Sequence, residues 1–368
     1  MLRYAFGHKR WALILNSLTY SGDPVRYNLL GQTGLYVSEL CLGTMTFGGT
    51  GHWQNIGRLQ IDAVCDLLKR SFDAGINFID TANVYSLGEA ESLTGQAIQR
   101  LGLPREQLVI ATKATGSMNE LPNGRGQSRY HLLNELEASL KRLRLDHIDL
   151  YQLHGFDPLT PLEEVLSVLN DMVRSGKVRY IGLCNMASWH IMKALGISDR
   201  RHWARFESVQ AYYTIAGRDL EREIVPLLRD QKLGLMVWSP LAGGLLSGKY
   251  AADGKAPDGA RRTSFDFPPV DKSRAARCVD AMRPIAQARD VSVAQIALAW
   301  LLARSEVSTV IIGAKTVEQL EDNIASTKVR LSAAELETLD QVSQLAPEYP
   351  GWMLAFQGQS RVKPPLKE

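Results

Sequence analysis

The sequence predicts an α/β protein built as one closed (β/α)8 barrel of the TIM type, with a β-hairpin before it and extra helices after it. Eight short apolar runs bounded by glycine or polar residues are typical of buried strands, and helical spacing of apolar residues separates most of them. The length of 368 residues suits one such barrel with insertions. A doubly wound sheet would carry a GxGxxG turn after an early strand, and this sequence has none.

The predicted elements alternate along the chain as a barrel requires. A hairpin is expected over 26–38, and the strands at 39–44, 75–80, 108–113, 148–154, 178–183, 208–211, 234–238 and 308–312. Helices are expected at 59–72, 89–101, 128–144, 160–174, 272–288, 292–303 and 333–345, with a further one beginning within 313–323. The segment 251–270, rich in Gly, Pro, Arg and Asp, is expected to be a loop or flap.

The barrel is expected to span 26–346, between a terminal extension at 1–25 and a tail at 347–368. Lys9-Arg10 and the apolar stretch that follows resemble a signal peptide. However, Asn16 interrupts that stretch, and no small-residue cleavage pattern comes after it. We therefore expect the extension to lie outside the fold.

The composition argues against several classes of function. A net charge of +3, without a basic block interleaved with aromatics, gives no support for nucleic-acid binding. No run of 18 apolar residues is present, so no membrane-spanning helix is expected. The cysteines form no CxxC pair, which indicates free thiols, no bound metal and a reducing, cytoplasmic compartment; they are Cys41, Cys65, Cys184 and Cys278.

Titratable side chains follow three successive predicted strands. Asp80 ends the second strand with Tyr85 on the loop beyond it, Lys113 ends the third strand, and His154 ends the fourth. Taken singly, each has an ordinary structural explanation, such as a turn cap or a packed tyrosine. Because the carboxyl ends of barrel strands meet on the face that carries active sites, their joint occurrence favours an active site.

These four residues suit proton transfer to a carbonyl oxygen. A tyrosine has a reference pKa of about 10, and we expect the Lys113 ammonium to lower the pKa of Tyr85. Asp80 would keep Lys113 charged and oriented. Tyr85 would then protonate a developing alkoxide, with His154 helping to stabilise the oxyanion, while hydride arrives from a cofactor.

Several stretches resemble the aldo-keto reductase family over nearly all of the predicted fold. They are FIDTANVY at 78–85 with GEAE at 88–91, LYQLH at 150–154, GLCN at 182–185, WSPLAGGLLSGKY at 238–250 and GAKTVEQLEDN at 313–323. The last two resemble the branch that contains potassium-channel β-subunits and many bacterial NADPH-dependent reductases. The resemblance implies a catalytic tetrad of Asp80, Tyr85, Lys113 and His154.

The resemblance also implies an NADP(H) site, with NAD possible. Asn185 and Gln210 would hold the nicotinamide carboxamide, Trp238 would stack on the ring, and Lys315 would pair with a 2′-phosphate and favour NADP. Cys184 stands where many members carry serine. The further implied cofactor contacts are Gly43, Thr44, Asp80, Ser239, Leu241, Gly243, Gly248, Lys249, Gly313, Gln319, Asp322 and Asn323. Without the family pattern, these stretches would be interpreted as a flexible glycine-rich loop and a solvated helix end.

The predicted activity is NADPH-dependent reduction of a small aldehyde or ketone. Tyr85, His154, Met45 and Trp53 are expected at the substrate, with Phe47, Tyr212 and Tyr213 as further aromatics near the mouth and the tail at 349–353 covering the same face. Two alternatives share the machinery, namely a nicotinamide-binding regulatory subunit and an enzyme that oxidises an alcohol or sugar. A homo-oligomer is compatible with the sequence.

Overall fold

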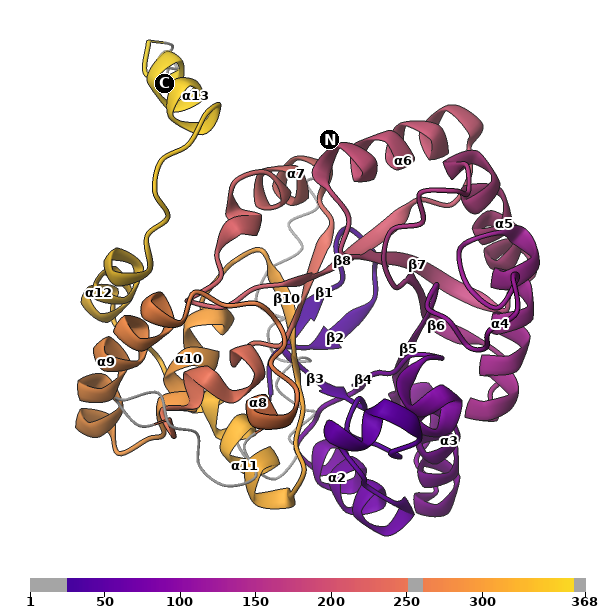
Figure 1. Ribbon diagram of the computed structural model, residues 1–368, viewed down its shortest axis with the longest axis horizontal. Coiled ribbons are helices and arrows are strands. Elements are labelled where there is room, and N and C mark those ends of the chain that lie inside the picture. The colour runs from indigo at the N-terminus through magenta and orange to yellow at the C-terminus, as the bar shows by residue number, and fades with distance from the viewer. Residues whose placement is uncertain (1–24, 251–260, 361–368) are drawn as a thin grey trace, which may run out of the picture.

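The computed structural model describes residues 25–250 and 261–360, and it confirms the predicted barrel (Figure 1). Eight parallel strands close in the order β10-β3-β4-β5-β6-β7-β8-β9. They are β3 Leu40–Gly43, β4 Phe78–Asp80, β5 Val109–Ala114, β6 Ile148–Leu153, β7 Val178–Cys184, β8 Phe206–Tyr212, β9 Gly234–Trp238 and β10 Val307–Ile312. Of the expected terminal extension, 1–24 lie outside the described residues, and Val25 is buried in the core.

Helices surround the barrel and follow most of its strands. They are α2 Ile61–Asp73, α3 Glu89–Leu101, α4 Arg129–Leu143, α5 Leu162–Arg174, α6 Ser188–Arg201, α7 Ile224–Gln231, α8 Arg261–Ser264, α9 Lys272–Arg289, α10 Val293–Leu302, α11 Val317–Ala325, α12 Ala333–Ser343 and α13 Gly351–Gly358. The sequence patterns missed α6, α7, α8 and α13. All but α6 have eight residues or fewer, too short for a clear apolar period. In the described part of the chain, none of the helices combines the length and apolarity needed to cross a bilayer.

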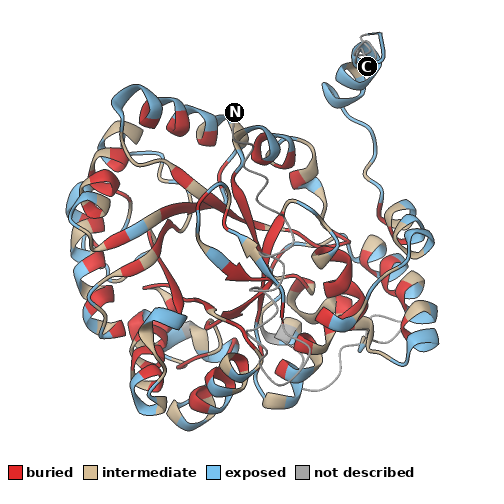
Figure 2. Cartoon of the chain, turned by 180° about the vertical axis from the view of Figure 1, so that it is seen from behind, coloured by how far each residue is buried: buried red, intermediate tan, exposed pale blue. Residues whose placement is uncertain are grey.

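The core has two layers because a barrel strand is buried on both faces. One layer fills the barrel interior and includes Cys41, Phe78 and Met236. The larger layer lies between the strands and the helices, and Figure 2 shows buried residues along the strands and on the inward sides of the helices. The helix α5 illustrates the pattern, because its buried residues recur at helical spacing and include Val165, Leu166 and Leu169.

The hairpin of β1 (Tyr27–Leu29) and β2 (Tyr36–Ser38) closes the amino-terminal end of the barrel. Its strands pair antiparallel, as predicted. Leu30 and Val37 are fully buried and join the interior core layer. Asn28 Nδ2 donates to Ser308 O at the start of β10 over 2.9 Å, which ties the hairpin to that end of the barrel. The opposite end therefore remains as the mouth.

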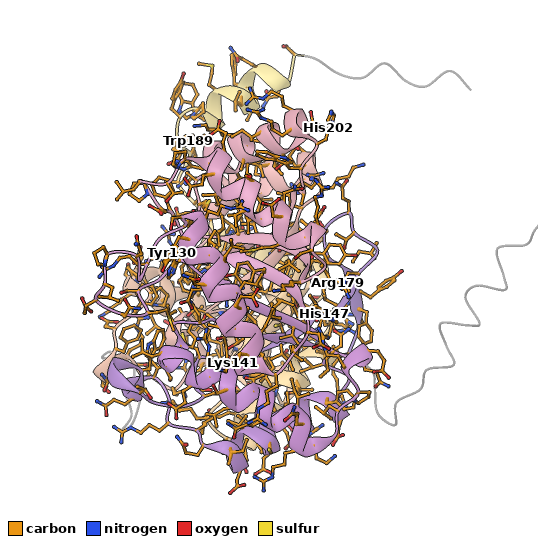
Figure 3. The ribbon with its side chains drawn as sticks, turned by 90° about the vertical axis from the view of Figure 1, so that its right-hand side faces the viewer. Tyr130, Lys141, His147, Arg179, Trp189 and His202 are labelled. Atoms are coloured by element: carbon orange, nitrogen blue, oxygen red, sulfur yellow. The ribbon has the colours of Figure 1, made fainter. Side chains whose placement is uncertain are left out.

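The two ends of the barrel can be followed on its outer wall in Figure 3. Tyr130 and Trp189 begin α4 and α6 and lie toward the mouth, whereas His147 and Arg179, next to the starts of β6 and β7, lie toward the closed end. This separation places the carboxyl end of every strand, and the loops that follow, on one face of the molecule.

The expectation that the tail covers the mouth is wrong in this structure. Arg222 Nη1 donates to Ala346 O over 3.2 Å, and Arg222 Nε lies 3.0 Å from Glu348 Oε1. These contacts fix the start of the tail beside the loop that follows β8. From there the chain leads away from the barrel, and α13 stands clear of it (Figure 1). Trp352 on this helix is 49% exposed.

Candidate active site

A cavity of about 630 Å³ opens at the mouth of the barrel and is bounded by the carboxyl ends of its strands. Its volume lies within the range of small-molecule sites. Most of the residues predicted for catalysis, cofactor or substrate line it, namely Gly43, Thr44, Met45, Trp53, Asp80, Tyr85, His154, Asn185, Gln210, Trp238, Ser239, Leu241, Gly243, Lys249, Gly313, Lys315, Gln319, Asp322 and Asn323. One continuous space therefore joins the predicted tetrad to the predicted cofactor site.

Asp80, Lys113 and Tyr85 meet at the inner end of this cavity. Lys113 Nζ donates to Asp80 Oδ2 over 2.6 Å and to Thr81 O over 2.7 Å. The same ammonium lies 3.4 Å from Tyr85 Oη. Lys113 is fully buried and reaches the cavity only through these neighbours. Parallel pairing of β3, β4 and β5 places the two strand ends side by side, as the sequence predicted.

Two buried amides hold the other oxygen of Asp80. Gln152 Nε2 donates to Asp80 Oδ1 over 3.1 Å, and Gln210 Nε2 donates to the same oxygen over 3.0 Å. Sequence reasoning gave Gln210 only a carboxamide role and missed Gln152. The signal was its position two residues before His154, because alternate residues of a strand share a face.

The pKa of Tyr85 shifts in the direction opposite to the one that the sequence predicted. Burial raises the pKa of Tyr85 above its usual value, and the Lys113 ammonium offsets only part of that rise. Burial also opposes the charged form of Lys113, but Asp80, followed by Tyr85 and Cys184, raises the pKa of Lys113 above its usual value. The expected lowering of the Tyr85 pKa is therefore wrong, because desolvation of the phenolate outweighs the nearby cation.

His154 lies beside Tyr85 as a neutral ring. The two rings meet edge to face, with centroids 5.7 Å apart. Burial, followed by the charge of Lys113, lowers the pKa of His154 to about 3. An uncharged imidazole can donate one hydrogen bond at neutral pH, so His154 is suited to orient a carbonyl oxygen rather than to supply its proton.

Trp238 and Asn185 line the cavity next to His154. Trp238 Nε1 donates to Asn185 Oδ1 over 2.9 Å, and Asn185 Nδ2 donates to His154 O over 3.3 Å. Phe267 lies parallel to the Trp238 ring, with 6° between the planes and centroids 5.8 Å apart. Phe265 and Phe267 line the cavity but were absent from the predicted site. They belong to the predicted flap at 251–270, of which 251–260 lie outside the described residues.

The cavity extends over a glycine-rich turn to the beginning of α11. Ser239, Gly243 and Gly244 have left-handed backbones, and Gly243 N donates to Ser239 Oγ over 3.2 Å. Thr316 caps α11 by accepting from Gln319 N, and Gln319 Oε1 accepts from Lys315 N over 2.9 Å. A glycine-rich turn and a helix amino terminus are typical places for phosphate binding.

Other predicted residues lie away from the cavity. Phe47 and Tyr213 are almost fully buried in the core between strands and helices, and Tyr213 packs against Trp300. Their expected place at the substrate is wrong. Tyr212 packs beside Trp238, with centroids 5.2 Å apart. Among the described residues, neither Tyr212 nor Gly248 is part of the cavity lining.

A family comparison agrees with this geometry. The model of the aldo/keto reductase family matches residues 39–344, which cover the barrel from β3 to α12. The chain belongs to the aldo/keto reductase family.

The chain is similar to family members whose names describe different roles. An uncharacterized oxidoreductase, YrpG of Bacillus subtilis, is 38% identical and covers 86% of this chain and 96% of its own length. The versiconal hemiacetal acetate reductase of Aspergillus parasiticus is 32% identical over 86% of this chain and 96% of its own length. A probable voltage-gated potassium channel subunit beta of Arabidopsis thaliana is 34% identical over 89% of this chain and 99% of its own length.

A buried hydroxyl in the cavity of this aldo/keto reductase fits a ligand that forms hydrogen bonds, as a nicotinamide dinucleotide does. Thr44 Oγ1 is buried at the cavity wall, and no described residue forms a hydrogen bond with it. A buried hydroxyl without a partner is costly, so a ligand that hydrogen-bonds there would be favoured. This hydroxyl lines the same cavity as the glycine-rich turn, the first residues of α11, Lys315 and the Trp238 ring.

Proposed function

We propose that the protein reduces an aldehyde or ketone to an alcohol with NADPH. The observation that carries this proposal is the meeting of Lys113, Tyr85 and His154 at the inner end of a cavity whose other end has phosphate-binding features. Members of the family typically use NAD(P)H, and NADPH would supply the hydride when bound. The substrate would be small, because it shares the cavity with the cofactor.

Tyr85 acts as the proton donor in this proposal. Its raised pKa keeps the phenol protonated in the resting site, which suits a group that must give a proton rather than take one. The Lys113 ammonium, 3.4 Å from the phenol oxygen, stabilises the negative charge that develops on Tyr85 as the proton leaves. Neutral His154 donates a hydrogen bond to the carbonyl oxygen and orients it.

The cofactor would be held by the rest of the cavity. Trp238 would cover one face of the nicotinamide, with Asn185 fixed beside it by the indole hydrogen bond. Thr44 Oγ1 offers a hydrogen bond at the cavity wall. The turn around Gly243 and the α11 terminus would bind the phosphates, and the positive charge of Lys315 favours NADP over NAD.

The names of relatives favour two other assignments. Relatives named potassium channel subunit beta, at 34% identity, support a regulatory subunit that binds the same cofactor. A relative named putative aryl-alcohol dehydrogenase, at 33% identity, supports oxidation of an alcohol by the same residues. The supply of substrate, rather than the tetrad, separates oxidation from reduction.

The test is a titration with NADPH and separately with NADH, followed by turnover on a panel of small aldehydes and ketones. We expect tighter binding of NADPH, and turnover that falls by about 100- to 10,000-fold in Tyr85→Phe while NADPH binding is kept. Tyr130→Phe is the matched control, because Tyr130 is exposed on α4. Tight NADPH binding without turnover would favour the regulatory assignment. If neither cofactor binds, the proposal fails.

A further inference from the structure

A chain of polar side chains lies behind the loop that carries Tyr85, between β5, α3 and α4. Thr112 Oγ1 donates to Glu91 Oε1 over 2.5 Å, and Arg142 Nε donates to Glu91 Oε2 over 2.6 Å. Arg142 Nη2 lies 3.5 Å from Glu135 Oε2, and Asn83 Nδ2 donates to the same oxygen over 2.9 Å. We call the set Asn83, Glu135, Arg142, Glu91 and Thr112 the support network.

The two ends of the support network are adjacent in sequence to Tyr85 and Lys113. Asn83 lies two residues before Tyr85, and Thr112 directly precedes Lys113. The backbone joins the same segments, because Asn83 N donates to Lys113 O over 3.1 Å. The network therefore connects the loop that carries the phenol to the strand that carries the ammonium by a second, side-chain route.

The loop itself is strained where it follows Tyr85. Ser86 and Leu87 are consecutive non-glycine residues with φ of 50° and 53°. Such left-handed conformations are unfavourable for L-residues and persist only when the surroundings fix them. Gly88 comes next, and a Cβ on it would lie 2.7 Å from Arg142 Cδ, so glycine allows the Arg142 side chain to pass close to the backbone.

The support network places charged side chains in a buried space, which has a desolvation cost. Glu91 is fully buried, and Glu135 and Arg142 are mostly buried. Buried ion pairs often stabilise a protein no more than apolar residues of the same volume, because the charges must be desolvated. Stability therefore does not by itself account for charges at this place. Directional bonds that fix one loop geometry do account for them.

We propose that the support network is a positioning device that sets the separation of Tyr85 Oη and Lys113 Nζ in the active site. Its five members are then positioning residues that act through Tyr85 and Lys113 and touch neither substrate nor cofactor. Their effect on the rate of carbonyl reduction rests on the proposed function. Their role in placing Tyr85 can be measured without turnover.

The test compares Asn83→Ala, which cuts the network at the loop, with Glu135→Ala, which cuts it on α4. The second variant serves if the first fails to fold. Ser343→Ala is the matched control, because it also removes a buried side chain that forms a hydrogen bond, here with Arg218. Ser343 lies in α12 and does not line the cavity. Each protein is labelled with 3-fluorotyrosine, and the Tyr85 resonance is assigned in the ¹⁹F NMR spectrum by its loss in Tyr85→Phe.

We expect both network variants to shift or broaden the Tyr85 resonance, and the control to leave it unchanged. In the active enzyme we also expect kcat to fall by about 10- to 100-fold with KM and NADPH affinity kept, since a misplacement of about 1 Å can cost that much. A Tyr85 resonance that stays unchanged in both network variants overturns the inference. Absence of turnover in the unmodified protein would instead defeat the proposed function, and the NMR comparison would still decide the placement of Tyr85.

Discussion

Lys113 and Asp80 form an ion pair inside the barrel, with 2.6 Å between Nζ and Oδ2. Their side chains are 0% and 3% exposed, so both charges are almost fully desolvated. The pair is the electrostatic centre of the site, because it keeps an ammonium charged next to a phenol that burial holds protonated.

Replacement of Asp80 by asparagine should therefore both destabilise the protein and impair proton transfer. The buried Lys113 would lose its counter-charge, which typically costs about 3–5 kcal/mol. Burial would then lower the pKa of Lys113, and turnover should fall most at alkaline pH. Urea unfolding and the pH profile of kcat measure the two effects. The control is Asp73→Asn, whose ion pair with Lys69 is exposed and should contribute less than about 1 kcal/mol. Equal stability losses in the two variants would contradict the prediction.

His154 should make stability depend on pH. Its pKa is about 3 in the folded protein, against about 6.5 for an unperturbed histidine, so the unfolded chain binds one more proton between these values. The folded state is consequently disfavoured as pH falls below about 6.5, by up to about 1.4 kcal/mol per pH unit for one proton.

The measurement is urea unfolding between pH 4.5 and 7.5 for the unmodified protein and for His154→Gln. The slope of the unfolding free energy against pH reports how many more protons the unfolded chain binds than the folded protein. In the variant this number should be smaller by close to one. His202→Asn is the control, since His202 is exposed and asparagine tolerates its left-handed backbone. An unchanged slope in His154→Gln would mean that His154 titrates normally in the folded protein.

The barrel could be predicted because its strands are buried on both faces and therefore appear as short apolar runs. The meeting of Asp80, Lys113 and His154 could be predicted too, since barrel geometry brings strand ends together. The sign of the Tyr85 pKa shift could not, because a sequence shows a neighbouring cation but not the depth of burial. Phe47 and Tyr213 were misplaced for a similar reason, since an aromatic residue after a strand can face the core or the cavity.

The phosphate end of the cavity gives a prediction about cofactor preference. Lys315→Met should weaken NADPH binding by about 10- to 100-fold, the usual effect of losing a charge-assisted hydrogen bond. NADH binding should change little, because NADH lacks the 2′-phosphate. Fluorescence titrations with both cofactors measure the effect, and Lys193→Met, at an exposed position on α6, is the matched control. Parallel losses for NADPH and NADH would assign Lys315 to the shared phosphates instead.

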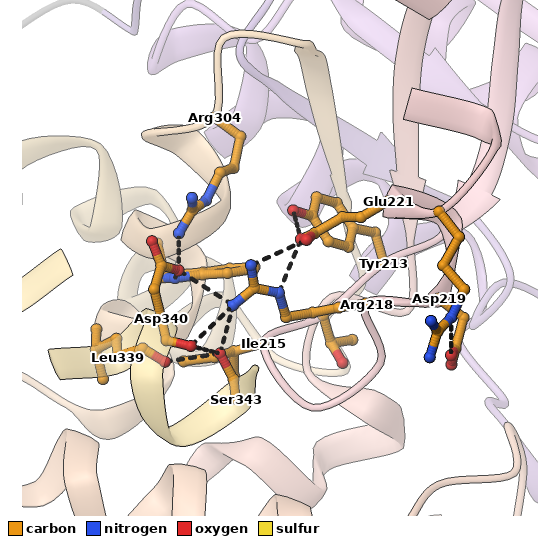
Figure 4. A network of polar contacts seen from close by, with 12 residues as sticks. Tyr213, Ile215, Arg218, Asp219, Glu221, Arg304, Leu339, Asp340 and Ser343 are labelled. Carbon is orange, nitrogen blue, oxygen red and sulfur yellow. Dashed lines mark hydrogen bonds and ion pairs between the residues drawn. The ribbon is translucent and has the colours of Figure 1, made fainter. Parts of the chain in front are cut away.

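Arg218 joins the loop after β8 to α12 in the network of Figure 4, and its loss should lower stability without affecting the tetrad. Its Nε and Nη2 atoms donate to the two oxygens of Glu221 over 2.8 and 2.9 Å, and Nη1 donates to Ser343 Oγ over 2.8 Å and to Asp340 Oδ1 over 3.3 Å. Asp340 also accepts from Trp300 Nε1 over 3.0 Å.

We expect Arg218→Ala to cost about 1–3 kcal/mol, less than the loss of a fully buried pair, because the Asp340 side chain is 36% exposed and water can solvate it. Arg218→Lys should recover only part of the loss, since a lysine ammonium cannot bind the Glu221 carboxylate with two parallel hydrogen bonds. Urea unfolding ranks the variants, and kcat at saturating substrate should stay close to that of the unmodified protein. If Arg218→Lys were as stable as the unmodified protein, a simple charge rather than the two parallel hydrogen bonds to Glu221 would account for the contribution of Arg218 to stability.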